Sequence, residues 1–168
     1  MTQNKAVEIG DELKGFIGKE MSRRGSYPVS ASDIRKWAIA IYWPEAPPRL
    51  FWDEEYAKKT RFGDIVAPED FNPFAWPTEL GQTFMTDADL KEPTERLGIG
   101  WNVLNGGGGN EYHERIRPGD VIESVTRLAD IYTRPGKLGT MIFFIRESTW
   151  TNEKGQVVRI SRGTGIRY

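Results

Sequence analysis

The stretch LNGGGGNEYHERIRPGD, residues 104–120, decides the fold, because it joins a run of four glycines directly to a strand-like segment. Glycine has no β-carbon, so its backbone can pass where a side chain would collide with another backbone or with a ligand. Glycine runs are more often flexible loops. Here, however, an extended segment over residues 110–116 follows rather than a polar linker. The run therefore predicts a backbone that closely approaches a neighbour. It is not a phosphate-binding loop, since neither Lys-Ser, Lys-Thr nor a helix follows.

Beyond the glycines the sequence is dominated by extended segments separated by short turns. Alternation with period two, although imperfect in places, predicts strands. The expected strands are residues 110–116, 121–132, 140–151 and 156–168, with turns at 134–137 and 152–155. Long strands joined by short turns form an antiparallel meander, whose apolar face needs a covering layer. The fold class is therefore α+β, with one curved antiparallel sheet around a helix.

The region before the glycines predicts the covering layer. Apolar residues at i, i+3, i+4 and i+7 indicate a helix over residues 33–43, with Ser30 or Ser32 as its cap and Pro44 at its end. The other expected elements are a short strand at 26–29, a short helix at 53–59 and a polar excursion, a lid or loop, at 78–99.

Composition excludes several classes of function. The 168 residues favour a single domain, 1–168, and the formal net charge of -1 gives no electrostatic reason to expect nucleic acid or an anionic membrane as partner. There is no cysteine and one histidine, which argues against a metal site. The polar N-terminus and the lack of a long apolar run lead us to expect a cytoplasmic protein.

Aromatic residues are numerous, with six Trp, six Tyr and eight Phe. Many lie in the first half of the chain, in a segment broken by prolines. Large aromatic side chains mainly supply core and interface area. This cluster indicates either a large apolar pocket or a subunit contact, and the sequence leaves both open.

Several motifs together resemble the MaoC-like (R)-specific enoyl-CoA hydratases and dehydratases, and most closely their FAS1-like dehydratase half. The resemblance runs from about Tyr27 to the C-terminus. It rests on DEEYA at 53–57 with RFG at 61–63, on Gly107-Gly108 leading to RPGD at 117–120, and on TNEKG at 151–155. It implies the hot-dog fold, a curved antiparallel sheet wrapped around a central helix, paired edge to edge with a second hot dog.

The resemblance also implies a chemistry, the reversible addition of water to a trans-2-enoyl-CoA thioester, with no separate cofactor. The family signature Asp-x-Asn-Pro-Leu-His supplies an aspartate and a histidine that activate the water. Its glycine-rich segment presents backbone donors to the thioester carbonyl. By this resemblance Gly107 and Gly108 are expected to contact the substrate.

The chain departs from the signature where the proton-carrying pair should lie. Counting back from Asp53, the histidine position holds Phe51, which cannot carry a proton. Glu45 can stand for the aspartate only if extra residues follow it; otherwise it is an exposed loop acid. The lone histidine, His113, lies elsewhere and is either catalytic or a structural or interface residue. The catalytic residues thus stay unknown, with Glu45 and His113 as the candidates.

A scaffold without this pair resembles the non-catalytic half of a double hot dog, in which a shortened central helix makes room for a bulky, branched or steroid-derived acyl group. Prolines at 68, 73 and 77 would shorten the helix here. Phe71, Phe74 and Trp76 then either line an acyl-binding space or merely fill the gap.

We therefore expect a hydratase or dehydratase subunit that needs a catalytic MaoC-like partner. Two alternatives stay open. One is a homo-oligomer that binds acyl-CoA or another hydrophobic ligand without chemistry. The other is a hot-dog thioesterase, which would use a carboxylate such as Glu45 or Asp70 to activate water.

Overall fold

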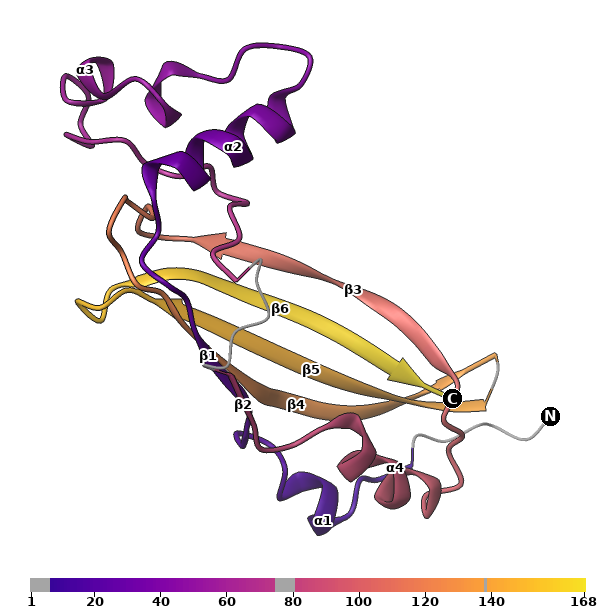
Figure 1. Ribbon diagram of the computed structural model, residues 1–168. Coiled ribbons are helices and arrows are strands. Elements are labelled where there is room, and N and C mark those ends of the chain that lie inside the picture. The colour runs from indigo at the N-terminus through magenta and orange to yellow at the C-terminus, as the bar shows by residue number, and fades with distance from the viewer. Residues whose placement is uncertain (1–6, 75–80, 138) are drawn as a thin grey trace.

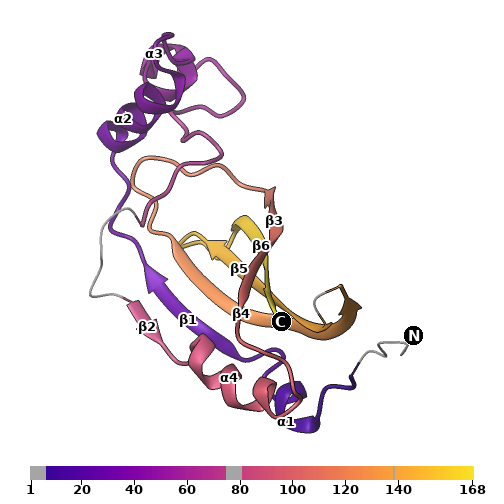
Figure 2. The same cartoon turned by 90° about the vertical axis from the view of Figure 1, so that its right-hand side faces the viewer.

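The computed structural model describes residues 7–74, 81–137 and 139–168, and within them six strands form one curved antiparallel sheet (Figures 1 and 2). The strand order is β2-β1-β4-β5-β6-β3, and every neighbouring pair is antiparallel. The strands are β1 (Glu20–Gly25), β2 (Gly81–Thr83), β3 (Val103–Tyr112), β4 (Glu123–Gly136), β5 (Gly139–Thr151) and β6 (Val157–Arg167).

The expected meander is confirmed as β4-β5-β6, but several boundaries differ from the prediction. The turn predicted at 134–137 is wrong, because β4 continues to Gly136, where it pairs with Gly139. Strand β3 ends at Tyr112 and not at Ile116. Strand β3 begins at Val103, so the four glycines lie inside the strand and not in front of it. The first strand is β1 and ends at Gly25, whereas residues 26–29 are not a strand. That segment still pairs locally, because the Val29 N–H donates to the Asp120 carbonyl and the Gly119 N–H donates to the Val29 carbonyl.

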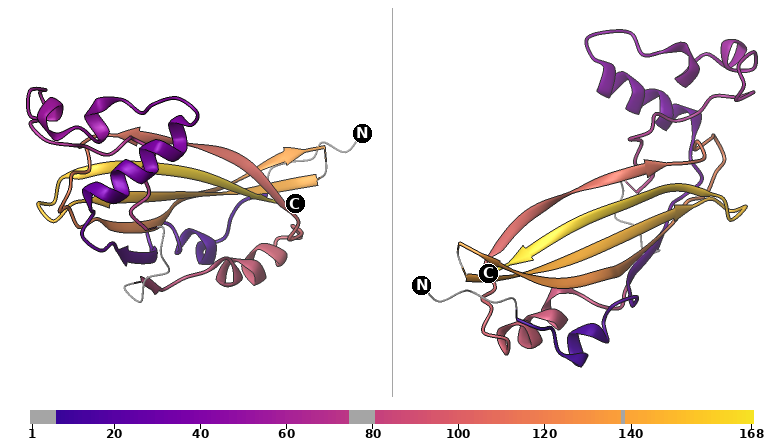
Figure 3. Two further views of the ribbon diagram at one scale, coloured as in Figure 1. Left: turned by 45° about the horizontal axis from the view of Figure 1, so that its top comes forward. Right: turned by 180° about the vertical axis from the view of Figure 1, so that it is seen from behind.

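The predicted helix before Pro44 is confirmed as α2 (Ala31–Tyr42), and Ser30 is its cap, since its side chain accepts a hydrogen bond from the Asp33 N–H. A 3-10 turn, η1 (Arg49–Phe51), and a short helix, α3 (Glu54–Ala57), follow. Together α2, η1 and α3 form a unit that projects beyond one end of the sheet (Figures 1 and 3).

The prediction of a polar excursion at 78–99 is wrong for residues 81–99, which include β2 and the helix α4 (Asp87–Glu95), whereas residues 78–80 lie outside the described residues. Thr86 and Asp89 make a capping box at its start, and Leu90, Pro93 and Thr94 are buried. A short helix, α1 (Asp11–Lys14), lies beside it. Within the described ranges, no helix combines the length and the apolar character needed to cross a membrane.

Two hydrophobic clusters lie at opposite ends of the sheet. We call its inner face the one that carries Phe144, Ser148 and Trp150 of β5, because Phe144 and Trp150 belong to these clusters. The α4 cluster holds Leu13, Met21, Met85, Leu90, Ile99, Leu128, Ile131, Ile142 and Phe144. The α2 cluster holds Val29, Ile34, Ala38, Phe51, Ala57, Ile65, Val66, Ala67, Phe71, Phe74, Ile116, Ile122, Trp150 and Val158.

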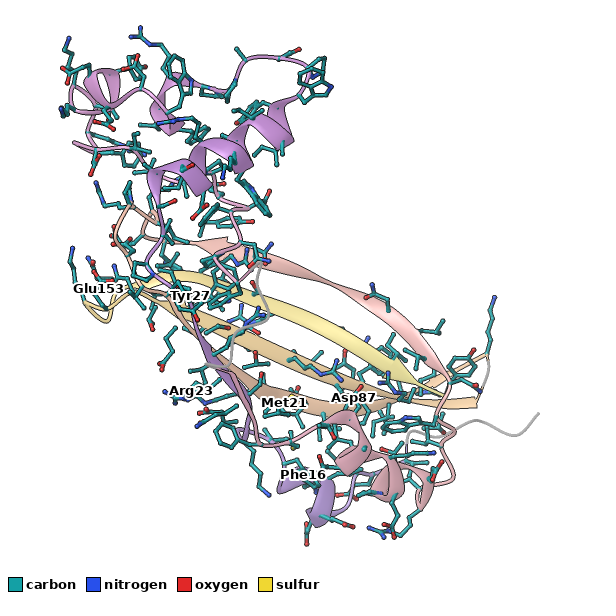
Figure 4. All side chains as sticks on the ribbon, in the orientation of Figure 1. Phe16, Met21, Arg23, Tyr27, Asp87 and Glu153 are labelled. Atoms are coloured by element: carbon teal, nitrogen blue, oxygen red, sulfur yellow. The ribbon has the colours of Figure 1, made fainter. Side chains whose placement is uncertain are left out.

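Asp87 fixes the start of α4 to the sheet (Figure 4). Its carboxylate accepts from Arg167 Nη2 of β6 at 2.6 Å and from Arg146 Nη2 of β5. The Arg167 side chain is only 6% exposed, whereas Asp87 keeps 41% of its side-chain area exposed. A buried guanidinium needs this partner, because a buried charge without one is costly.

We predict that Asp87→Ala lowers the free energy of unfolding by about 2–3 kcal/mol, less than for a fully buried pair because Asp87 is partly solvated. Chemical denaturation monitored by circular dichroism measures this. The matched control is Glu92→Ala on the same helix, which breaks an exposed pair with Arg96 and should cost about 0.5 kcal/mol or less. Equal effects of the two substitutions would contradict an anchoring role for Asp87.

Candidate functional site

The position expected to hold the catalytic histidine is occupied by a buried ring. Phe51 is 7% exposed and belongs to the α2 cluster, with its ring centroid 6.0 Å from that of Tyr42. Next to it, Asp53 accepts from the Tyr56 N–H as the cap of α3 and forms a 2.6 Å salt bridge with Arg49. This loop is thus built around an apolar contact and an ion pair.

The structure does not join the two catalytic candidates to each other. Glu45 follows α2, His113 follows β3, and both side chains are exposed. Within the described residues no side-chain hydrogen bond or salt bridge connects them or involves either one, and neither lines a cavity described below. A proton-transfer pair needs its two groups within reach of one substrate atom, so the catalytic role of Glu45 and His113 stays a prediction.

Phe71 and Phe74 are buried, each in an edge-to-face contact with a tryptophan. The ring centroids are 5.7 Å apart for Trp37 and Phe71, and 5.0 Å apart for Phe74 and Trp150. Trp76 lies outside the described residues. Phe74 thus fills the core, whereas Phe71 fills one side and faces a cavity on the other.

This cavity lies between the start of α2 and the segment that follows Pro68, and its volume is about 340 Å³. Its lining is mainly apolar, with Asp33 and Lys36 as its charged members. The indole Nε1 of Trp37, which also lines the cavity, is buried and has no hydrogen-bond partner among the described residues. An apolar cavity with a few polar groups is the usual form of a small-molecule site, so the geometry makes this cavity the candidate acyl pocket.

The glycine run makes the close backbone approach that the sequence indicated, and the neighbour is strand β6. A β-carbon on Gly108 would lie 2.3 Å from the Arg162 carbonyl oxygen. Gly107 has φ +84°, at a shift of register between Asn105 and Gly108, and its N–H donates to Asn105 Oδ1 at 2.8 Å. That N–H is therefore already occupied, and the substrate contacts of Gly107 and Gly108 stay a prediction.

A polar cluster that the sequence did not reveal lies beside the end of β3. The Tyr112 hydroxyl donates to Asp70 Oδ1 at 2.5 Å, and Asn110 Nδ2 donates to the Tyr112 oxygen at 3.2 Å. The hydrogen bond to Asp70, and to a lesser degree burial, raise the pKa of Tyr112. Asp70 is separated from Tyr112 by 41 intervening residues of chain, and no local pattern could pair them. Within the described residues, no three His, Cys, Asp or Glu side chains gather in a way that could hold a metal ion.

Comparison with known proteins shows which family and which solved structures this chain resembles. The profile of the family described as "FAS1-like, dehydratase domain region" matches residues 15–161. No match was found among curated protein sequences.

Several solved structures are similar over most of their length. The ChsH1-ChsH2 complex from Mycobacterium tuberculosis gives a TM-score of 0.70 at 18% identity, covering 95% of this chain and 90% of that one. A MaoC-like dehydratase from Rhodospirillum rubrum gives 0.57 at 19% identity, covering 90% and 92%. The HadBC (3R-hydroxyacyl-ACP dehydratase) complex from Mycobacterium tuberculosis gives 0.56 at 16% identity, covering 88% and 96%. These likenesses confirm the hot-dog fold.

We predict that Gly108→Ala lowers the free energy of unfolding by about 2 kcal/mol, because the new methyl group would collide with the β6 backbone and force β3 away from it. Thermal denaturation should show a fall in Tm of roughly 4–8 °C. Gly109→Ala is the matched control, since its β-carbon would meet nothing within 4 Å. If Gly108→Ala were as stable as Gly109→Ala, the glycine would not be needed for close strand packing.

Proposed function

Because the chain belongs to the FAS1-like dehydratase family, which it matches over residues 15–161, we propose that it is the substrate-binding subunit of a MaoC-like enoyl-CoA hydratase or dehydratase. A second MaoC-like subunit with the intact signature would supply the catalytic aspartate and histidine. Because its substrate would be a CoA thioester, we place the protein in the cytoplasm.

The observation that carries this proposal is Phe51. A buried phenyl ring occupies the histidine position, while the fold around it is intact. In hydration, a base takes a proton from water as its oxygen bonds to C3 of the enoyl group, and C2 receives a proton. Phe51 can neither take nor deliver that proton. In our proposal these proton-carrying groups come from another chain.

Strand β3 offers the edge that such a partner requires. It lies at the end of the sheet beyond β6, and no other described strand pairs with its second edge. All its residues except Tyr112 are exposed, and Val103 is 64% exposed. A ten-residue edge of this kind, rich in glycine, readily accepts another strand. Two of the similar structures, ChsH1-ChsH2 and HadBC, are described as complexes, which supports pairing with a second subunit.

The apolar cavity beside Trp37 and Phe71 provides a place for the acyl group. Lys36 at its lining supplies one positive charge. We assign to this cavity the apolar part of the acyl chain. The exposed aromatic residues of the α2 unit, including Trp43 and Trp52, would extend the contact with the partner.

We predict that the purified chain alone hydrates a trans-2-enoyl-CoA no faster than buffer. Co-expression with a MaoC-like subunit from the same genome that carries the Asp/His pair should raise the rate at least about 100-fold, the usual scale of one general acid or base. Loss of the enoyl absorbance measures the reaction. The control is the same complex with the partner's signature histidine replaced by alanine, which should be inactive.

Other outcomes identify the alternatives. Robust hydration by the chain alone would overturn the two-subunit proposal. Release of CoA thiol that disappears in Asp70→Asn would identify a thioesterase. Binding of acyl-CoA by a homo-oligomer, without reaction in any mixture, would identify a binding module.

We also predict that Val103→Asp weakens the complex about tenfold or more, because its carboxylate would be desolvated against the cross-strand neighbours that the added strand places on the same face of the sheet. The isolated chain should keep its stability, since Val103 is exposed there. Analytical ultracentrifugation measures both association and oligomeric state. Val121→Asp, an exposed valine outside the strands, is the matched control. An unchanged complex in Val103→Asp would show that β3 is not the interface.

A further inference from the structure

A continuous row of polar residues crosses the inner face of the sheet, one from each strand. The strand register places Thr83, Ser22, Thr126, Ser148, Ser161 and Asn110 side by side from β2 to β3. We call these six residues the polar row. The Thr126 and Ser148 hydroxyls hydrogen-bond to each other at 2.7 Å, whereas Ser161 Oγ is buried and has no partner among the described residues.

A second row lies two residues further along each strand, on the same face, and it carries two arginines. Its members, in strand order β1, β4, β5, β6 and β3, are Arg24, Ser124, Trp150, Arg159 and Tyr112. The Arg24 guanidinium lies 4.3 Å from the centre of the Phe74 ring, and that of Arg159 lies 3.5 Å from the centre of a Trp150 ring. Since Phe74 and Trp150 contact each other, the two cations flank one aromatic pair.

Neither arginine has an acidic partner among the described residues. Arg159 Nε is buried without a hydrogen-bond partner. Desolvation lowers the pKa of both guanidinium groups, although Arg24 is an exposed residue. For Arg159, attraction to Tyr112 and Asp70 opposes this lowering of the pKa, and repulsion from Arg24 is a smaller contribution. Arginine nevertheless stays charged at neutral pH. Asp70, whose charge acts on Arg159, accepts a hydrogen bond from the Tyr112 hydroxyl.

Their counterparts on the outer face are neutralised. Arg23, the neighbour of Arg24 in β1 (Figure 4), pairs with Glu20 and Glu123 at 2.9 Å each. Arg162 of β6 pairs with Glu147 at 2.7 Å and with Glu111. On the inner face, within the described residues, the arginines without such an acidic partner are thus Arg24 and Arg159, which lie beside the polar row.

A guanidinium that is stacked on an aromatic ring keeps its N–H edge available for a planar oxyanion. Hydroxyl and amide groups beside it can hydrogen-bond the same ligand. A cavity of about 350 Å³ lies at the β1 end of the polar row, where Arg24 but not Arg159 lines it, and its other lining residues are Ser22, Arg23, Gly81, Gln82, Thr83 and Thr126. An apolar group placed there would leave these polar groups desolvated, at a cost of about 1–3 kcal/mol each.

We propose that the inner face recognises a carboxylate at the far end of the acyl chain, held by Arg24 and Arg159 with the polar row beside it. The inference rests on the proposed function and narrows its substrate class to thioesters of dicarboxylic acids or similar anionic acyl groups. At the end of the acyl chain, this inference replaces the expectation of an apolar group with that of a carboxylate.

The test is calorimetric titration of the full chain, alone and with its partner subunit, with two pantetheine thioesters of equal length. Adipoyl-pantetheine carries a terminal carboxylate, and hexanoyl-pantetheine ends in a methyl group. We expect adipoyl-pantetheine to bind at least tenfold more tightly. Arg159→Gln and Arg24→Gln should each weaken it roughly 10- to 100-fold, the scale of a hydrogen bond to a charged group, and should leave hexanoyl-pantetheine unchanged.

The matched control is Arg162→Gln, which removes an arginine from the outer face of β6, the strand that carries Arg159, and should change neither affinity. Arg159→Lys, which keeps the charge but loses the planar fork, guards against a folding defect and should retain part of the preference. Equal affinity for the two thioesters would overturn the proposal. The proposal would also be overturned if Arg159→Gln weakened the binding of hexanoyl-CoA but not that of hexanoyl-pantetheine. That result would show that the arginines bind the phosphates of CoA.

Titration with free adipate separates this inference from the proposed function. If no thioester binds, the substrate-subunit proposal fails, while adipate binding that is lost in Arg159→Gln would still support the carboxylate site. If adipate binding is absent or independent of both arginines, the carboxylate site fails, whatever the thioesters do.

Discussion

The polar row is the constraint on which the rest of the structure depends. A hot-dog sheet is stabilised by the apolar elements that cover its inner face, yet six hydroxyl- or amide-bearing residues divide that face here. If an apolar helix covered them, their hydrogen-bonding groups would be left without partners. The covering layer is therefore split: α4 packs on one cluster, the α2 unit and the segment around Phe71 on the other.

This division separates stability from function. The α4 end is closed by Asp87, whose carboxylate satisfies two arginines and ties the helix to β5 and β6. The α2 end keeps a cavity and an indole N–H without a partner among the described residues. Unsatisfied polar groups are costly in a core but useful in a binding site, because a ligand can satisfy them. The binding features thus gather at the end and middle of the sheet that α4 does not cover.

The sequence predicted those parts of the fold whose signals are local. The meander follows from alternation and from turns such as residues 152–155, and α2 follows from its helical period and from Ser30. Helix α4 was missed because Leu90 is its only large apolar residue, and Pro93 obscured the pattern. Of the site, Phe71 could be anticipated from its setting. The polar row and the Asp70–Tyr112 pair could not, because strand register brings together residues that are scattered along the chain.

The phenylalanine at the histidine position and the polarity of the inner face support the same proposal, a subunit that recognises the substrate without transferring protons. With Phe51 in the core, the loop that would handle protons instead holds α2, η1 and α3 together. In the proposed function the chain needs no catalytic water, and its interior would hold the end of the substrate. An arginine pair in a solvated catalytic pocket would compete for a developing negative charge, whereas in a subunit without that chemistry it can serve recognition alone. If proton transfer and substrate recognition lie on separate chains, as we propose, the acyl preference could change without disturbing the catalytic pair, because the two chains would meet at the exposed edge of β3 and not at the acyl site.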